Sequence, residues 1–421
     1  MGAEEQWAGV LAHVVDASHL VHGEQLSIMI DEAVRVVGMT AEVLLVDLAQ
    51  QVLTPVQPDP GPPLSVAGSL AGRAYQHGEI LAGTDESGER LLWVPMLDGT
   101  ERAGVLRIGL GRDVVDDAWL RAWAWSLSGL MGHIAMTKLV YSDHLRRLRS
   151  NGPLSPASEL LWQLLPPRTF ATEDVVVSAL LEPHHRVAGD AFDYTIDGTL
   201  LHLAVFDGVG HDLRAGLTTT LAITAIRNAR RAGENDLVAL ARRADELIRA
   251  QPGPRQFVTA VLVALDTATG VMTYLIAGHP PPLLVRHNRV VKELAAPPRV
   301  PLGVPAPDGV PVVVSREQLE PGDRLLLYSD GITEARDGAG EFFGEHRLVE
   351  FTERAQADDL SAPETLRRLV AAVLAHQGGE LQDDATLLMV DWSSDGHRRM
   401  VPTLGAGPGR PSTRVAATGP S

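Results

Sequence analysis

Residues 187–212 have the sequence VAGDAFDYTIDGTLLHLAVFDGVGHD, and this stretch decides the fold of the second half of the chain. Residues 200–206 form a short, mostly apolar run that ends close to glycine, which predicts a buried strand. Asp207 is then delivered at the end of that strand, beside Gly208, whose bare backbone lets a ligand approach. Asp190 comes from the loop before this hairpin. Two carboxylates are therefore predicted to meet at one end of one sheet.

The same construction returns later in the chain. Residues 324–329 form another apolar strand, which runs into Asp330. Asp383 stands directly before the last predicted strand, residues 387–390. Magnesium and manganese ions take oxygen ligands of this kind and keep several waters. Without a cation, carboxylates crowded together would repel each other and shift their pKa values. The pattern therefore predicts a divalent metal site.

Five segments of the second half carry a family resemblance, and they occur in a fixed order. They are Ala188–Asp193, Asp207–His211, Ala277–Pro282, Leu327–Ala335 and Asp383–Thr386. Together they resemble the SpoIIE-type branch of the metal-dependent (PPM) serine/threonine protein phosphatases, over about residues 169–392. One Asp-Gly pair is weak evidence, but five motifs in the right order are strong evidence.

The resemblance implies a fold, a cofactor and a set of ligands. The expected fold is the PPM α-β-β-α sandwich, and the expected cofactors are two Mn²⁺ or Mg²⁺ ions. By this analogy Asp207 bridges both ions, and the Gly208 carbonyl completes one coordination shell. Asp190 serves the first ion directly or through water, and Asp330 and Asp383 bind the second. Two such ions activate a water that attacks phosphorus in line.

Several neighbouring residues keep alternative readings. His211 either protonates the leaving oxygen or makes a structural hydrogen bond. Asp193 is a cap or a support for the ligands, and Asp384 either orients Asp383 or binds a further ion. Arg186 is expected on the surface more than at a phosphate. His279 is expected in a turn.

Composition narrows the function classes. The chain has 421 residues, 45% of them apolar, a net charge of −17 and no cysteine. The negative charge argues against a nucleic-acid partner, and the lack of cysteine excludes disulfides and thiolate metal sites. The acidic start shows no signal peptide, so a cytoplasmic location is expected. Arg121 and Lys138 flank an uncharged window too short for the ~20 apolar residues of a membrane span.

The first half predicts a separate α+β domain. A helix over residues 24–38 is followed by strands over 41–48, 91–96 and 104–110. The apolar run at residues 92–97 and its continuation resemble a GAF-type sensory domain, which would bind a small molecule. The alternative is a generic α+β domain with no ligand.

The organisation expected from these patterns has five parts. They are an N-terminal segment (1–22), a GAF-like domain (23–140), a helical linker (141–168), the phosphatase-like domain (169–392) and a disordered tail (393–421). The helical pattern at residues 115–148 leaves a parallel coiled-coil homodimer open, with too few heptads to decide.

Three functions remain compatible with the sequence. The first is a phosphoprotein phosphatase regulated by its N-terminal domain, whose substrates by family analogy include phosphorylated anti-anti-sigma factors. The second is a non-catalytic phosphoprotein-binding regulator, which the complete set of expected acids disfavours. The third is a two-metal hydrolase of small phosphoesters, although no P-loop or dinucleotide fingerprint supports nucleotide binding.

Overall fold

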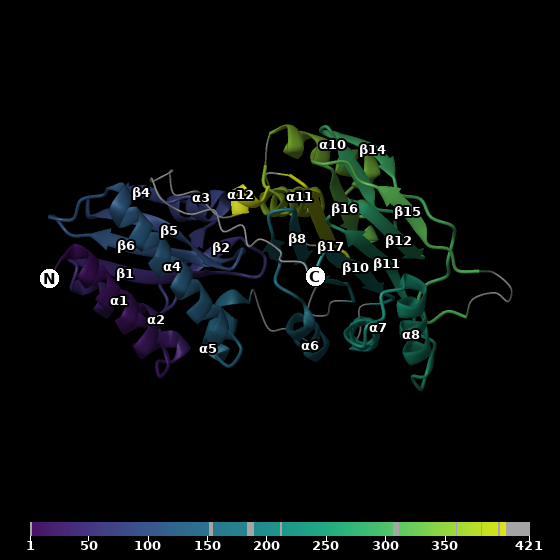
Figure 1. Ribbon diagram of the computed structural model, residues 1–421, viewed down its shortest axis with the longest axis horizontal. Coiled ribbons are helices and arrows are strands. Elements are labelled where there is room, and N and C mark those ends of the chain that lie inside the picture. Colours follow the sequence, from purple (N-terminus) through teal and green to yellow (C-terminus); the bar gives the residue numbers. More distant parts are fainter. Residues whose placement is uncertain are drawn as a thin grey trace, which may run out of the picture.

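The computed structural model describes residues 2–150, 155–182, 189–210, 213–305, 311–358, 360–379, 381–394 and 396–400. Two α+β domains lie side by side along the longest axis of the molecule (Figure 1). The first comprises the elements up to α5, and the second begins with α6. The predicted α+β class is confirmed for both halves.

The N-terminal domain is built on one six-stranded antiparallel sheet with the order β3-β2-β1-β6-β5-β4. Its strands are β1 (Met39–Val46), β2 (Val52–Pro55), β3 (Leu64–Ser65), β4 (Leu81–Thr84), β5 (Arg90–Asp98) and β6 (Glu101–Leu110). The central hairpin turns at Gly99, whose φ of +60° suits glycine. This turn places Glu101 at the start of β6.

Helices cover this sheet and share its core with the strands. They are α1 (Ala3–Ser18), η1 (Gly23–Gln25), α2 (Leu26–Arg35), α3 (Leu70–His77), α4 (Ala118–Leu139) and α5 (Asp143–Arg149). The sequence did not predict α1, yet Trp7, Val10 and Val14 on one face of it are buried. Trp7 stacks on Trp123 of α4 with ring centroids 5.8 Å apart. The first residues of the chain are therefore part of this domain's core.

The C-terminal domain packs two antiparallel sheets face to face. The five-stranded sheet has the order β15-β12-β11-β10-β9, and the six-stranded sheet the order β14-β13-β16-β17-β8-β7. The strands are β7 (Thr169–Ala171), β8 (Val175–Glu182), β9 (Ala191–Asp197), β10 (Leu200–Gly208), β11 (Val258–Asp266), β12 (Val271–Ala277), β13 (Leu283–Arg286), β14 (Arg289–Glu293), β15 (Ser315–Gln318), β16 (Arg324–Tyr328) and β17 (Ala385–Trp392).

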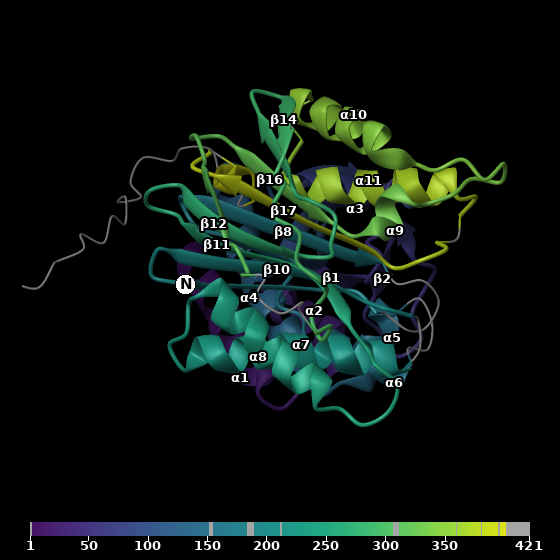
Figure 2. The same cartoon turned by 90° about the vertical axis from the view of Figure 1, so that its right-hand side faces the viewer.

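Helices lie on both outer faces of this sandwich (Figure 2). They are α6 (Pro156–Leu164), α7 (Leu213–Arg231), α8 (Leu237–Arg249), α9 (Asp330–Thr333), α10 (Gly344–Ala357), α11 (Ala362–His376) and α12 (His397–Met400). The pair α7 and α8 packs on the five-stranded sheet, while α10 and α11 pack on the six-stranded sheet. The four layers are the α-β-β-α arrangement that the resemblance implied.

Strand β8 shows why the sequences of the middle strands are nearly continuous apolar runs. Val175 and Val177 point into the core between the two sheets. Val176 and Leu180 point the other way and pack under α11. Because side chains alternate along a strand, a strand covered on both faces is apolar at nearly every position, and in β8 the exception among the fully buried residues is Ser178.

The ends of the C-terminal domain differ from a simple linker and tail. Leu161 of α6 is fully buried and belongs to the core cluster that also contains residues of α7 and α8. At the other end, Met400 of α12 is buried against the outer core under α11. Residues 401–421 lie outside the described part of the chain. Among the residues that the structure describes, no helix is both long enough and apolar enough to cross a membrane.

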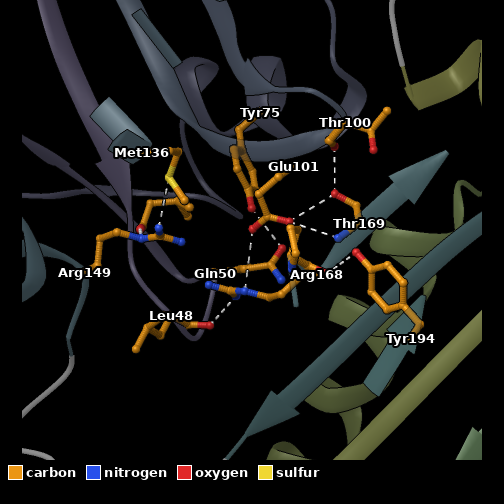
Figure 3. A network of polar contacts seen from close by, with 12 residues as sticks. Leu48, Gln50, Tyr75, Thr100, Glu101, Met136, Arg149, Arg168, Thr169 and Tyr194 are labelled. Atoms are coloured by element: carbon orange, nitrogen blue, oxygen red, sulfur yellow. Dashed lines mark hydrogen bonds and ion pairs between the residues drawn. The ribbon is translucent and has the colours of Figure 1, made fainter. Parts of the chain in front are cut away.

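A buried polar network joins the two domains (Figure 3). The Glu101 carboxylate accepts a hydrogen bond from the Thr169 backbone N–H at 3.0 Å. The Thr169 hydroxyl donates to the Thr100 carbonyl at 2.7 Å. Arg168 places its Nε 3.8 Å from Glu101 Oε1 and donates from Nη1 to the Leu48 carbonyl. The first strand of the second domain is thus hydrogen-bonded to the first domain.

Replacing Glu101 by alanine should weaken this junction. The substitution leaves the buried Arg168 without its nearest counter-charge and the Thr169 N–H without its side-chain acceptor. Breaking such a buried pair is costly, so we expect a loss of about 2–3 kcal/mol in the free energy of unfolding, measured by urea denaturation.

The control is Glu246→Ala, which removes an exposed ion pair with Arg243 within α8. Exposed pairs of this kind contribute little, so the change should stay under about 0.5 kcal/mol. Equal effects of the two substitutions would contradict the role assigned to Glu101.

Candidate active site

Four chain turns bring acidic residues to one end of the sandwich. Asp207 ends β10, and Asp190 immediately precedes β9, its antiparallel partner. Asp330 begins α9, shortly after β16 ends, and Asp383 lies just before β17, the antiparallel partner of β16. In an antiparallel pair the end of one strand meets the start of the next. Each sheet therefore contributes one pair of acids to the same end.

Two glycines allow the loops that carry Asp190 and Asp207 to touch. The Gly208 N–H donates to the Gly189 carbonyl at 3.1 Å. A Cβ on Gly189 would lie 2.7 Å from the Gly208 oxygen, and a Cβ on Gly208 would lie 2.4 Å from the Thr219 hydroxyl. No side chain fits at either position, which explains the glycines in both motifs.

Asp384, which directly precedes β17 of the six-stranded sheet, is hydrogen-bonded to the loop that carries Asp190. Its Oδ2 accepts hydrogen bonds from the backbone N–H groups of Gly189 and, at 3.4 Å, of Asp190. Its neighbour Asp383 caps the turn itself, because Asp383 Oδ1 accepts the Asp384 N–H at 2.9 Å. The sequence left open whether Asp384 orients Asp383 or binds a further ion. Its contacts with the N–H groups of Gly189 and Asp190 add a role that neither reading included, because they orient the loop of Asp190.

The turn after β16 is fastened to the turn before β17. The Thr386 N–H donates to the Ser329 hydroxyl at 3.0 Å, and the Ser329 N–H donates to the Thr386 carbonyl at 3.0 Å. A Cβ on Gly331 would lie 1.9 Å from the Asp384 carbonyl oxygen. The backbones of the two turns are thus in direct contact, and this contact sets where Asp330 and Asp383 stand.

The charges of these acids act on one another. Burial, followed by the charges of Asp207 and Asp384, raises the pKa of Asp190 well above its ordinary value. Burial and then the charges of Asp330 and Asp383 raise the pKa of Asp207 to about 7, although a hydrogen bond with Asp190 opposes the shift. Burial and Asp383 also raise the pKa of Asp330. The cluster therefore disfavours its own ionised state.

A divalent cation fits the chemistry of this cluster. Asp190 is 3% exposed, and no residue in the described part of the chain donates a hydrogen bond to its Oδ2. A buried carboxylate oxygen without a donor is rare and calls for a positive partner. The side-chain atoms that could coordinate a metal here are all carboxylate oxygens, which suits Mg²⁺ or Mn²⁺. Within the described ranges, however, no group of three or more acidic or histidine side chains is already drawn together around one point.

Asp193 has a different environment from the other acids of this region. The Arg227 guanidinium donates to its Oδ1 at 2.6 Å and the Arg230 guanidinium to its Oδ2 at 2.6 Å. The carboxylate is 1% exposed. Both oxygens already have cationic partners, so Asp193 fastens β9 to α7 and has no need of a metal ion.

The remaining candidate residues are three that the sequence singled out and two threonines that it did not. His211 and Arg186 lie outside the described residues. His279, expected in a turn, is buried and makes two ring hydrogen bonds. Sequence reasoning missed Thr259, which pairs in register with Asp207. It also missed Thr219, whose hydroxyl donates to the Gly189 carbonyl at 2.6 Å. Strand register and helix docking set these contacts, and no local sequence signal marks them.

Comparison with known families agrees with this geometry. Residues 197–393 match the family described as Stage II sporulation protein E (SpoIIE). The C-terminal half of the chain is therefore a SpoIIE-type domain of the PPM phosphatase class. The match does not reach the N-terminal domain, whose type is not identified, and its GAF-like character stays a prediction.

Individual relatives cover parts of the chain. Protein IcfG of Synechocystis sp. is 25% identical over 245 residues, which span 51% of this chain and 37% of IcfG. Phosphoserine phosphatase RsbU of Bacillus subtilis is 23% identical over 265 residues, or 60% of this chain and 75% of RsbU. Among solved structures, the RsbU and RsbW domains of Rv1364c from Mycobacterium tuberculosis align with 29% identity and a TM-score of 0.44, over 52% of this chain and 60% of that one.

The stability of the metal-free protein should fall as pH rises. The folded pKa of Asp207, about 7, lies above its ordinary value of 3.8, so the folded state holds a proton that the unfolded state releases between these values. The stabilisation that this bound proton gives the folded state is complete below about pH 4 and is lost as pH passes 7. The free energy of unfolding should fall by an amount on the order of 3 kcal/mol. Urea denaturation in chelator between pH 4.5 and 8 measures this decline.

Asp207→Asn should flatten part of that decline, because asparagine does not titrate. Asp197→Asn, in the exposed hairpin turn between β9 and β10, should keep the parent's slope. Saturating Mn²⁺ should remove the loss of stability in the parent, since a cation replaces the bound protons. A parent profile that rises from pH 5 to 8 in chelator would contradict the pKa assignment.

Proposed function

We propose that this chain is a metal-dependent phosphoprotein phosphatase acting on phosphoserine or phosphothreonine. The observation that carries the proposal is the meeting of Asp190, Asp207, Asp330 and Asp383, from both sheets, at one end of a SpoIIE-type domain. In support, RsbU, one of the relatives, is named a phosphoserine phosphatase. By family analogy the substrate is a phosphorylated anti-anti-sigma factor.

The roles proposed for the side chains follow from their positions. The charges of Asp330 and Asp383 act on Asp207, and a hydrogen bond links it to Asp190. We assign it the bridging position, with the Gly208 carbonyl beside it. Two Mn²⁺ or Mg²⁺ ions held here would activate a water for in-line attack on phosphorus and neutralise the phosphoryl oxygens. His211 stays the proposed acid for the leaving oxygen, with a structural hydrogen bond as the alternative.

Asp207→Asn tests the assignment most directly. The variant keeps the side-chain shape and removes the charge that would hold two cations together. We expect turnover of a phosphoserine peptide at saturating Mn²⁺ to fall on the order of 10³-fold or more, comparable with the loss of a main electrostatic stabiliser. Excess EDTA should stop the parent enzyme.

Asp197→Asn is again the matched control and should leave turnover within about twofold, because asparagine also suits a hairpin turn. A folded Asp207→Asn variant that stays within a few-fold of the parent would refute the bridging role. A parent that binds Mn²⁺ yet cleaves no phosphopeptide would favour the non-catalytic regulator. Faster cleavage of nucleotides than of phosphopeptides would favour the small-phosphoester hydrolase.

We also propose that the N-terminal domain regulates this activity. The two domains have separate cores, and the junction at Glu101 and Thr169 links them. A fragment starting at residue 155 keeps Leu161, which the C-terminal core needs. We expect this fragment to fold, bind Mn²⁺ and hydrolyse phosphopeptide with a kcat that differs several-fold from that of the full chain.

Steady-state kinetics on both proteins measure this effect, and Mn²⁺ affinity serves as the internal control. If fragment and full chain shared the same kcat and KM, regulation by the first domain would have to be abandoned. If only the N-terminal domain bound the metal, the location of the active site would be wrong.

A further inference from the structure

A short chain of polar contacts leads from the Asp207 carboxylate to the other sheet. Thr259 stands opposite Asp207 in the pairing of β11 with β10. Its hydroxyl oxygen lies 3.5 Å from Asp207 Oδ2 and 2.7 Å from His279 Nδ1. The opposite ring nitrogen of His279, Nε2, lies 3.0 Å from the Tyr328 carbonyl oxygen. Four residues thus form one continuous path.

The chemistry of the partners sets the direction of each hydrogen bond. The Tyr328 carbonyl can only accept, so His279 Nε2 carries the hydrogen and donates it. Burial lowers the pKa of His279 to about 4, which keeps the ring neutral at ordinary pH. Nδ1 of the neutral ring is then an acceptor, and the Thr259 hydroxyl is its donor.

The hydroxyl has one hydrogen and two neighbours that could take it. The contact with His279 is short, whereas the one with Asp207 is at the long limit of a hydrogen bond. The Thr259 oxygen therefore packs beside the carboxylate while most of its hydrogen-bonding capacity goes to the imidazole. Thr259 therefore takes up little of the hydrogen-bonding capacity of Asp207, whose other side-chain partner is Asp190.

The path also crosses between the two sheets that supply the acids. Thr259 belongs to the five-stranded sheet, and Tyr328 ends β16 of the six-stranded sheet, two residues before Asp330. His279 follows β12 and Gly278, where a Cβ would lie 2.7 Å from the Pro301 ring. The backbone just before His279 therefore lies close to Pro301, and the imidazole of His279 is hydrogen-bonded to residues of both sheets.

We propose that Thr259 and His279 are positioning residues for the metal-binding carboxylates, fixing Asp207 relative to Asp330 and leaving its oxygens free for cations. This inference rests on the proposed function. Residues that orient metal ligands without touching the metal commonly change metal affinity or activity 10–100-fold when they are replaced.

A purely structural role gives a different result. A buried hydroxyl and imidazole that only hold the core together would lower stability equally with and without metal. Positioning residues lower the stability gained from metal, because that gain depends on the dissociation constant. The decisive quantities are therefore the Kd for Mn²⁺ and the rise in Tm that Mn²⁺ produces.

The test uses Thr259→Val in the full chain, with Thr259→Ser as the matched control. Valine keeps the shape and removes the hydroxyl, while serine keeps the hydroxyl. Isothermal titration with Mn²⁺ should show Kd increased about 10-fold or more for valine and within about threefold for serine. The Mn²⁺-induced rise in Tm should shrink for valine alone.

The outcomes separate this inference from the proposed function. If Thr259→Val binds Mn²⁺ as tightly as the parent while Asp207→Asn does not bind, the positioning role is overturned and the metal site stands. If the parent binds no Mn²⁺, the proposed function fails and this inference with it. If Thr259→Val does not fold, His279→Gln takes its place, because one amide cannot reproduce both ring contacts, and the same Kd criterion applies.

Discussion

The repulsion among buried carboxylates is the constraint on which the rest of this domain depends. Asp190 and Asp207 are held together although burial and neighbouring charge make their ionised forms unfavourable. Such an arrangement persists only when surrounding structure enforces it. Here the enforcement comes from glycines with no room for a side chain and from Asp384, which accepts the N–H groups of the Asp190 loop. The sandwich therefore stores an electrostatic cost that a divalent cation would relieve.

The neighbouring acids show that this cost is local and specific. Asp193 is as buried as Asp190, yet two arginines neutralise it. At the opposite end of the central strands β16 and β17, the Arg324 guanidinium donates to both oxygens of Asp391. The chain is thus able to supply a counter-charge where an acid serves structure alone. The absence of a described cationic side chain on Asp190 Oδ2 is what marks it for an external cation.

The sequence contained the acids and their strand ends, because a strand that ends in Asp-Gly is a local pattern. It could not reveal the partners of those acids. Thr259 meets Asp207 only through the register of β10 and β11, and His279 reaches Tyr328 across two sheets. Some local structure was missed as well. The β13–β14 hairpin turns at His287 and Asn288, both with positive φ, and this pair lacks the usual glycine signal. The apolar run at residues 312–314 favours a strand, yet β15 begins only at Ser315.

The docking of β7 on the N-terminal domain has a mechanical consequence. Strand β7 pairs with β8, which pairs with β17, and β17 starts beside Asp383 and Asp384. Backbone hydrogen bonds across a sheet resist stretching far more than side-chain packing resists sliding. A displacement of the first domain is therefore carried stiffly to Asp330 and Asp383, while the other pair of acids, on the facing sheet, is only packed against them. The distance between the two pairs of acids therefore depends on the relative position of the two domains.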